Sequence, residues 1–139
     1  MARLEKTVFF PPKVTPETEA FWNGCREHKL LVPVCRHCGK TYWPAGKFCP
    51  DCLSEDTGWK EASGKGTLYS YVVFEQAFHP SLTEKLPYVV ATVDLEEGVR
   101  LVSNVTDCEL EEVRCGMPVT VDWADGEQYT HPVFVPVKE

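Results

Sequence analysis

The chain has 139 residues, of which 43% are hydrophobic and 25% charged, and its formal net charge is −7 at pH 7. These values are typical of a soluble globular protein with one domain, or with a small module joined to a modest one. The sequence shows no basic apolar leader and no run of eighteen apolar residues, so we expect neither export nor a membrane span. Seven cysteines, an odd number, fit a reducing compartment and predict a cytoplasmic protein.

Charge is distributed unevenly along the chain. Residues 1–27 carry four basic and four acidic groups, and residues 28–60 carry five basic and three acidic groups. Residues 61–139 carry five basic and fourteen acidic groups, which gives this part a net charge of −9. We therefore expect the C-terminal part to repel polyanions, while the middle part attracts them weakly.

The N-terminal segment is predicted to be extended over residues 1–14, with an apolar strip at Phe9-Phe10-Pro11-Pro12. A helix should follow. Thr15 is placed to cap it, the next residue is a proline suited to a first helical position, and the helix should run to about Glu27.

The predicted helix presents two adjacent aromatic residues, Phe21 and Trp22. They either pack on the chain's own core or anchor a partner protein, because Phe and Trp are frequent in both settings. The sequence leaves both interpretations open, and we retain the pair as a candidate partner interface.

Four cysteines stand in two Cys-x-x-Cys pairs with ten residues between the pairs. They are Cys35, Cys38, Cys49 and Cys52. Two such pairs, brought together by a hairpin, place four thiolates around one metal ion. Four protein ligands leave no open coordination position, so the metal should be structural, with zinc the first choice and iron the second. Two disulfides or accidental spacing are the alternatives.

The other three cysteines are expected to be small buried side chains. They are Cys25, Cys108 and Cys115. Around the metal pairs, Leu30 to Val34 is predicted to be a strand that Tyr42-Trp43 returns, and Leu53 to Ala62 is predicted to link the ribbon to the next unit. Leu53 follows the second pair where rubredoxins usually carry a glycine.

From Gly64 onward the sequence alternates with the period of a β-strand. In the first strand this alternation puts Leu68, Val72 and Phe74 on one face. A short helical element at about 109–113 follows the third strand, and this arrangement predicts a small Greek-key barrel, the OB fold. The five expected strands are 67–74, 88–95, 99–105, 119–123 and 130–135.

The predicted fold class is therefore mainly β, in three parts. An N-terminal extension with an amphipathic helix occupies residues 1–29, a rubredoxin-like zinc ribbon occupies residues 30–60, and a five-stranded OB-fold barrel occupies residues 61–139.

The layout from about Thr15 to Pro136 resembles a known family in which an amphipathic helix and a zinc ribbon precede an OB-fold domain. The resemblance lies in short motifs that recur in the same order and spacing. They are Phe21-Trp22, the four paired cysteines, Gly64-Lys-Gly66-Thr-Leu-Tyr69-Ser-Tyr71, His79-Pro80, Pro87-Tyr88, Asp94-Leu-Glu-Glu-Gly98, Gly116-Met-Pro118-Val119 and Pro132-Val-Phe134-Val-Pro136.

The resemblance implies a non-catalytic accessory subunit of a thiolase-superfamily complex that acts on an acyl-CoA. Such partners include thiolases, lipid-transfer-type thiolases, related retro-aldolases and hydroxymethylglutaryl-CoA synthases. The partner would hold most of the acyl-CoA and supply the catalytic groups, and the ribbon-barrel subunit would stabilise it and help shape the CoA channel.

Three cations of the ribbon are candidates to contact the CoA phosphates; alternatively, they only solvate the ribbon. They are Arg36, Lys40 and Lys47. After Trp43-Pro44 the family tends to continue with Pro and Arg, where this chain has Ala45 and Gly46. Lys47 is then the stand-in, although a lysine lacks the bidentate fork of an arginine.

Nucleic-acid binding is the alternative function, because zinc ribbons and OB folds often bind single strands. Tyr69, Tyr71 and Trp123 could stack on bases, but a barrel with a charge of −9 repels phosphate. The sequence offers no Ser/His/Asp or Cys/His arrangement, so we predict no catalytic residue in this chain.

Overall fold

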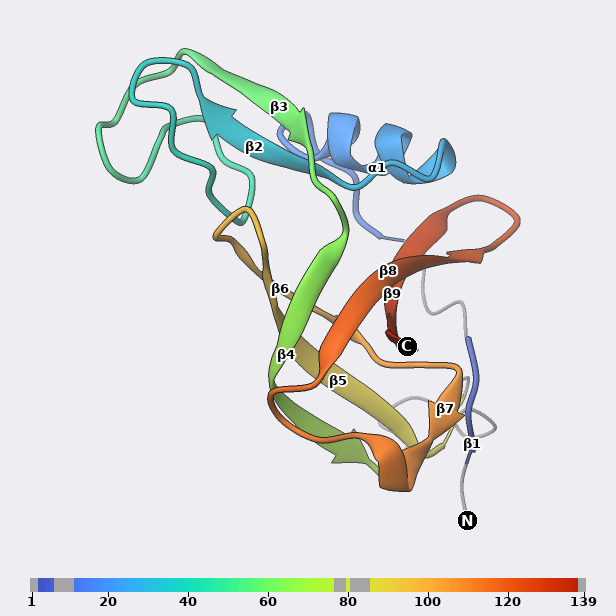
Figure 1. The fold of residues 1–139 in the computed structure, drawn as a ribbon. Coiled ribbons are helices and arrows are strands. Elements are labelled where there is room, and N and C mark those ends of the chain that lie inside the picture. The colour runs from blue at the N-terminus through green and yellow to red at the C-terminus, as the bar shows by residue number, and fades with distance from the viewer. Residues whose placement is uncertain (1–2, 7–11, 77–79, 81–85, 138–139) are drawn as a thin grey trace.

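The computed structural model describes residues 3–6, 12–76, 80 and 86–137. One α-helix lies beside a two-stranded ribbon, and a five-stranded barrel lies beyond them (Figure 1). The elements are β1 (Arg3–Leu4), α1 (Glu19–Arg26), β2 (Leu31–Cys35), β3 (Thr57–Glu61), β4 (Lys65–Phe74), β5 (Tyr88–Leu95), β6 (Arg100–Asn104), β7 (Cys108–Glu109), η2 (Leu110–Glu112), β8 (Pro118–Asp125) and β9 (Thr130–Pro136).

The ribbon is formed by β2 and β3, which pair antiparallel from Leu31↔Glu61 to Cys35↔Thr57. The chain returns beside β2 at Tyr42, as predicted, but through the isolated antiparallel bridge Val34↔Thr41 and the bond from the Tyr42 amide to the Pro33 carbonyl, and not as a strand. The segment expected to be a linker therefore supplies the second strand. Its sequence, Thr-Gly-Trp-Lys-Glu, lacks the alternation of a half-buried strand, which explains why the prediction missed it.

The helix begins at Glu19, three residues after Pro16, the predicted first helical position. Thr15 does not cap it; its carbonyl instead accepts hydrogen bonds from the amides of Thr18 and Glu19, so a turn precedes the first helical residue. Within the described residues no helix has the length and apolar character needed to cross a membrane. The predicted apolar strip Phe9-Phe10-Pro11-Pro12 lies outside the described residues except for Pro12.

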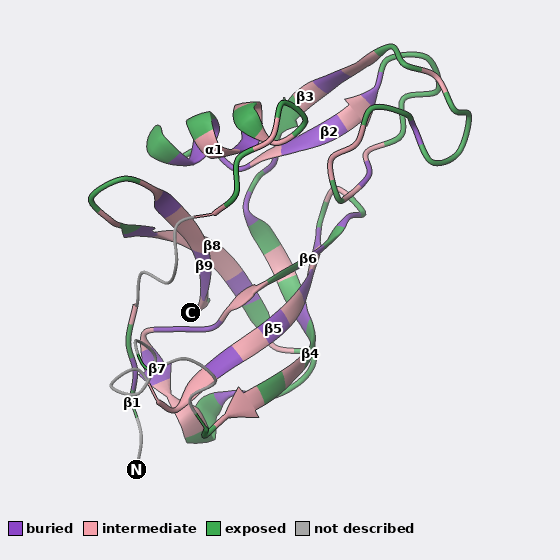
Figure 2. Ribbon diagram, turned by 180° about the vertical axis from the view of Figure 1, so that it is seen from behind, coloured by how far each residue is buried: buried purple, intermediate pink, exposed green. Residues whose placement is uncertain are grey.

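The barrel confirms the OB-fold prediction. Its sheet has the order β6-β5-β4-β8-β9, and a parallel bridge between Val105 and Phe134 brings its two edge strands together. The 3-10 helix η2 follows the third strand, as the sequence indicated. Figure 2 shows buried residues alternating with partly buried ones along β5, and Val93, Val119 and Phe134 of the barrel are fully buried.

A β-bulge in β4 overturns the predicted faces of that strand. The register with β5 shifts between Leu68 and Ser70, so Tyr71 and Val73 point inward and Val72 points outward, with 54% of its surface exposed. A bulge inserts one extra residue and so inverts the alternation beyond it. No sequence signal marked this position.

Two sets of contacts hold the ribbon and helix against the barrel. The β5–β6 hairpin reaches the ribbon, where the Thr41 hydroxyl donates a 2.7 Å hydrogen bond to the Glu97 carbonyl. At the end of α1, the imidazole of His28 stacks on Trp123 with 5.3 Å between ring centroids, and its Nε2 lies 2.9 Å from Asp125 Oδ1. These contacts fix where the ribbon sits relative to the barrel.

Gly64, which joins the ribbon to β4, cannot accommodate a side chain. Its φ is +84°, and a Cβ there would lie 2.3 Å from Val121 Cγ1. We expect Gly64→Ala to destabilise the protein by about 2–4 kcal/mol, from left-handed strain and overpacking together. Chemical denaturation followed by tryptophan fluorescence measures this change.

Gly46→Ala is the matched control, because a Cβ at Gly46 meets no atom within 4 Å. It should alter the free energy of unfolding by less than about 0.5 kcal/mol. Equal effects of the two substitutions would contradict the role given to Gly64.

Candidate metal centre

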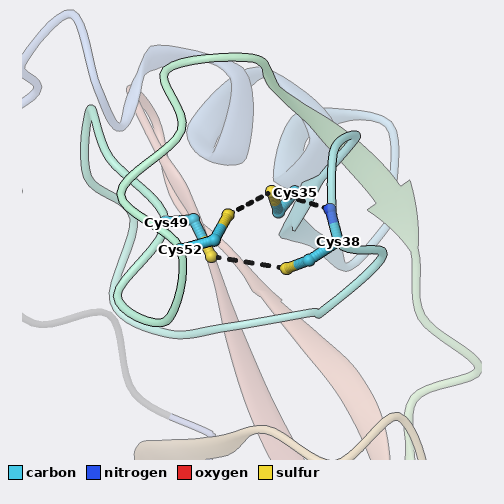
Figure 3. A group of neighbouring side chains, drawn as sticks. All are labelled: Cys35, Cys38, Cys49 and Cys52. Carbon is cyan, nitrogen blue, oxygen red and sulfur yellow. Dashed lines mark hydrogen bonds between the residues drawn. The ribbon is translucent and has the colours of Figure 1, made fainter.

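The four paired cysteines converge on one point at the end of the ribbon (Figure 3). Their sulfurs all lie within 4.8 Å of one another. The Sγ atoms of Cys35 and Cys52 are 3.5 Å apart, and those of Cys38 and Cys49 are 3.7 Å apart. A tetrahedral zinc site with Zn–S bonds of about 2.3 Å places its sulfurs roughly 3.8 Å apart, so the group fits one ion. These separations exclude the alternative of disulfides.

The two cysteine pairs sit in backbone loops of the same geometry. In the first loop, the Gly39 amide donates to the Cys35 carbonyl and the Cys35 amide to the Lys40 carbonyl. In the second loop, the Leu53 amide donates to the Cys49 carbonyl at 2.9 Å, and the Cys49 amide donates to the Ser54 carbonyl at 3.0 Å. Leu53 therefore takes the place of Gly39, and both have positive φ, 62° and 80°.

The first loop also polarises one sulfur. The Cys38 amide donates to Cys35 Sγ at 3.4 Å, and this bond is the largest cause that lowers the pKa of Cys35 to about 6. A hydrogen bond to the charged form favours the thiolate, which is the form that binds metal. The backbone thus prepares Cys35 as a ligand.

Neither Cys25 nor Cys108 is activated. Burial raises the pKa of Cys25 to about 12, and burial also raises the pKa of Cys108. Both are buried, as predicted, but Cys115 is exposed, so that prediction was wrong for one of the three. Among the described residues, the four paired cysteines form the one cluster of three or more potential ligands that could hold a metal ion.

The three candidate CoA-contacting cations are exposed, and each faces an acidic residue of the same ribbon. Arg36 lies 3.5 Å from Asp56, Lys40 lies 2.8 Å from Asp51, and Lys47 lies 3.7 Å from Glu55. Asp51, Glu55 and Asp56 were counted in the net charge of the sequence, but their ion pairs with the three cations were not predicted. The pairs leave this end of the ribbon locally neutral.

Lys47 also lines an open groove of about 590 Å³ between the ribbon and the start of the helical region. Tyr42 and Trp59 contribute aromatic walls, and Glu17 and Glu55 contribute carboxylates. Arg36 and Lys40 do not line this groove. The structure therefore does not gather the three cations into one anion site.

The two aromatic residues of α1 have different surroundings. Phe21 is buried and packs against Trp43, with ring centroids 5.0 Å apart. Trp22 is half-buried and lies edge-on to Tyr129 and His131 of the β8–β9 hairpin. Both residues thus contribute to the chain's own packing, and their role as a partner interface stays a prediction.

The structure does not bring the three candidate base-stacking residues together. Tyr71 points inward and its hydroxyl donates to the Val113 carbonyl. Arg100 covers the Tyr69 ring at 3.7 Å, and His28 covers Trp123. A single-strand binder needs free, adjacent stacking faces in a positive groove, so this geometry argues against nucleic-acid binding.

Family models match most of the chain. Residues 22–58 match the rubredoxin-like zinc ribbon domain of ChsH2, and residues 59–124 match the C-terminal OB-fold domain of ChsH2. The match to a zinc ribbon and the cluster of four sulfurs together identify the metal as a structural zinc, in preference to iron.

Curated relatives extend the similarity. A DUF35 domain-containing scaffold protein of Methanocaldococcus jannaschii is 40% identical over 102 residues, which cover 70% of each chain. A probable enoyl-CoA hydratase alpha subunit of Thermomonospora curvata is 37% identical over 91% of this chain. Because the match covers only 45% of that hydratase subunit, the chain spans less than half of the relative's length.

A solved structure also resembles the whole chain. It is a chain of the Ltp2-ChsH2(DUF35) aldolase, with a TM-score of 0.84 and 35% sequence identity. The superposition covers 91% of this chain and 98% of that one.

Loss of one thiolate should remove the metal. We expect Cys52→Ser to release the zinc and unfold the ribbon, because structural zinc contributes on the order of 10–16 kcal/mol in isolated zinc-finger peptides. Metal analysis of the purified variant should fall from one zinc per chain to below about 0.2. Cys115→Ser, which changes another exposed thiol, is the matched control and should retain its zinc. Full zinc occupancy in both variants would contradict the site.

Proposed function

Because the chain belongs to the ChsH2-type DUF35 family of zinc-ribbon and OB-fold proteins, we propose that it is the non-catalytic accessory subunit of an acyl-CoA enzyme complex. In this proposal the partner is a thiolase-fold catalytic subunit that performs C–C cleavage or condensation. This chain stabilises the partner and helps to shape its CoA channel.

The similarity to the DUF35 chain of the Ltp2-ChsH2 aldolase carries the proposal, because it extends over 98% of that chain. The similarity to a probable enoyl-CoA hydratase alpha subunit supports the assignment to acyl-CoA chemistry. The two relatives are named for different reactions, so the reaction is assigned to the partner and not to the shared fold.

The metal has a structural role in this proposal. We assign Cys35, Cys38, Cys49 and Cys52 as the four ligands of one zinc ion, which leave no position for substrate. Zinc here holds the two loops together while the β2–β3 pair supports them. The four thiolates need a reducing environment, and we place the protein in the cytoplasm for that reason.

Contact with CoA is the finer part of the proposal. Lys47 is the best placed of the three cations, because it lines the groove with Tyr42 and Trp59 and its ion pair with Glu55 is the longest of the three, at 3.7 Å. A phosphate that approaches Lys47 would compete with this exposed, weak ion pair. Arg36 and Lys40 would act only through long-range attraction.

Assembly is the direct test of the accessory role. The chain should be co-expressed with each thiolase-fold protein of its own genome and analysed by size-exclusion chromatography with light scattering. We expect a stable hetero-oligomer with one of them, and turnover of an acyl-CoA only when both chains are present. A chain that stays alone with every candidate, or that turns over an acyl-CoA unaided, would contradict the proposal.

Substitution of Lys47 tests the CoA contact within that complex. Lys47→Gln should raise the KM for the acyl-CoA by about three- to tenfold with little change in kcat, because a lost phosphate contact weakens ground-state and transition-state binding alike. Lys60→Gln removes an exposed cation of β3 that does not line the groove and should leave KM unchanged. Equal KM values in the two variants would place the CoA phosphates elsewhere.

A further inference from the structure

One exposed apolar residue of the ribbon has a strained backbone, which the second cysteine loop requires but which does not require a leucine. Leu53 has φ of 62°, a left-handed conformation that disfavours a bulky side chain. Its side chain is 71% exposed, so no packing within the chain offsets the strain. Glycine would occupy this position without strain, as Gly39 does at the matching place in the first loop.

The other strained residues show what is missing at Leu53. In the described part of the chain, two further non-glycine residues have positive φ, His28 and Asp107. His28 stacks on Trp123, and Asp107 forms an ion pair with Lys6. Their side chains hold elements of the fold together, whereas the side chain of Leu53 points into solvent. A side chain that adds backbone strain and stabilises no other element of the fold is a reason to look for a functional contact.

A second exposed apolar side chain belongs to the same loop as Leu53. Phe48 is 51% exposed and immediately precedes Cys49, whose carbonyl accepts the Leu53 amide at 2.9 Å. The backbone of the second loop therefore brings Leu53 close to Cys49, the residue that follows Phe48, and the exposed Cys52 lies between them in the same loop. The loops lie at the end of the β2–β3 pair away from α1 (Figure 1).

We propose that Phe48 and Leu53, here called the ribbon tip, insert into an uncharged apolar pocket on the catalytic subunit. This inference rests on the accessory role proposed above and assigns the docking surface for it. The tip presents an aromatic and an aliphatic anchor with a rim of ion pairs, which is the composition of an interface centre surrounded by a polar rim.

The charges around the tip favour a protein as its binding partner. Arg36, Lys40 and Lys47 each face an acid of the ribbon, so the surroundings of the tip are close to neutral and suit an uncharged pocket better than a polyanion or an anionic lipid surface. A second copy of this chain would bring together two molecules of net charge −7. An apolar pocket on a partner without that negative charge needs no positive field from the tip and meets no charge repulsion.

The sheet offers a competing apolar surface, which supplies the control. The outer side of β4–β5–β6 exposes Val72 by 54% and Val102 by 70%. The backbone of both residues is that of an ordinary strand, and neither has the positive φ of Leu53. Exposed valines on a strand need no functional explanation, so Val102 is a matched apolar residue outside the tip.

The test compares variants of the zinc-loaded chain in binding to the catalytic subunit that co-assembles with the wild-type chain. Leu53→Gly should keep its zinc and an equal or higher melting temperature, because the strain is removed. It should nevertheless raise the dissociation constant for the catalytic subunit by about ten- to a hundredfold, as loss of a hot-spot side chain does. Leu53→Asn, which also tolerates positive φ, should behave in the same way, and Val102→Ser should bind within about twofold of the wild type.

The outcomes separate the two proposals. A wild-type chain that binds, together with Leu53→Gly binding equally well, would overturn the ribbon tip and leave the accessory role intact. Loss of zinc or of stability in Leu53→Gly would also overturn it, because Leu53 would then serve the fold. A wild-type chain that binds no thiolase-fold protein would overturn the accessory role and the ribbon tip together.

Discussion

The convergence of four thiolates from two short loops is the constraint on which the ribbon depends. The segment between β2 and β3 has few buried apolar side chains; in it only Tyr42 and Cys49 are buried. A hydrophobic core cannot hold two such loops in place, whereas four metal–sulfur bonds can. The backbone prepares the site through paired carbonyl–amide bonds and through the amide that donates to Cys35.

A few contacts connect the ribbon that carries the metal site to the barrel. The loop after the first cysteine pair meets the β5–β6 hairpin at the bond from Thr41 to Glu97, and the second strand of the ribbon runs through Gly64 directly into β4. On the opposite side, α1 is held by the stack of His28 on Trp123. These contacts therefore join the ribbon, the helix and the barrel to one another.

The sequence predicted most of the fold and the metal cluster for identifiable physical reasons. The paired cysteines have a spacing that few other sites require, and β5 has the strict alternation of a half-buried strand, which its burial pattern reproduces. The strand β3 escaped prediction because its residues lack that alternation. The bulge after Leu68 and the ion pairs of the ribbon depend on register and on tertiary contacts, which a single sequence does not display. Leu53 was visible in the sequence as a departure from rubredoxin loops, but its positive φ and its exposure became known only from the structure.

The four cysteine residues of the cluster alternate between buried and exposed along the chain, and this pattern bears on their reaction with oxidants. Cys35 and Cys49 are buried, while Cys38 and Cys52 are exposed, so each loop contributes one shielded and one accessible residue. A peroxide or an electrophile that reaches the free chain meets one accessible thiolate from each loop, and damage to either opens the clamp. Oxidative stress would then act on the supply of competent subunits before they assemble, and a partner that covers the loops would shelter the thiolates that hold them.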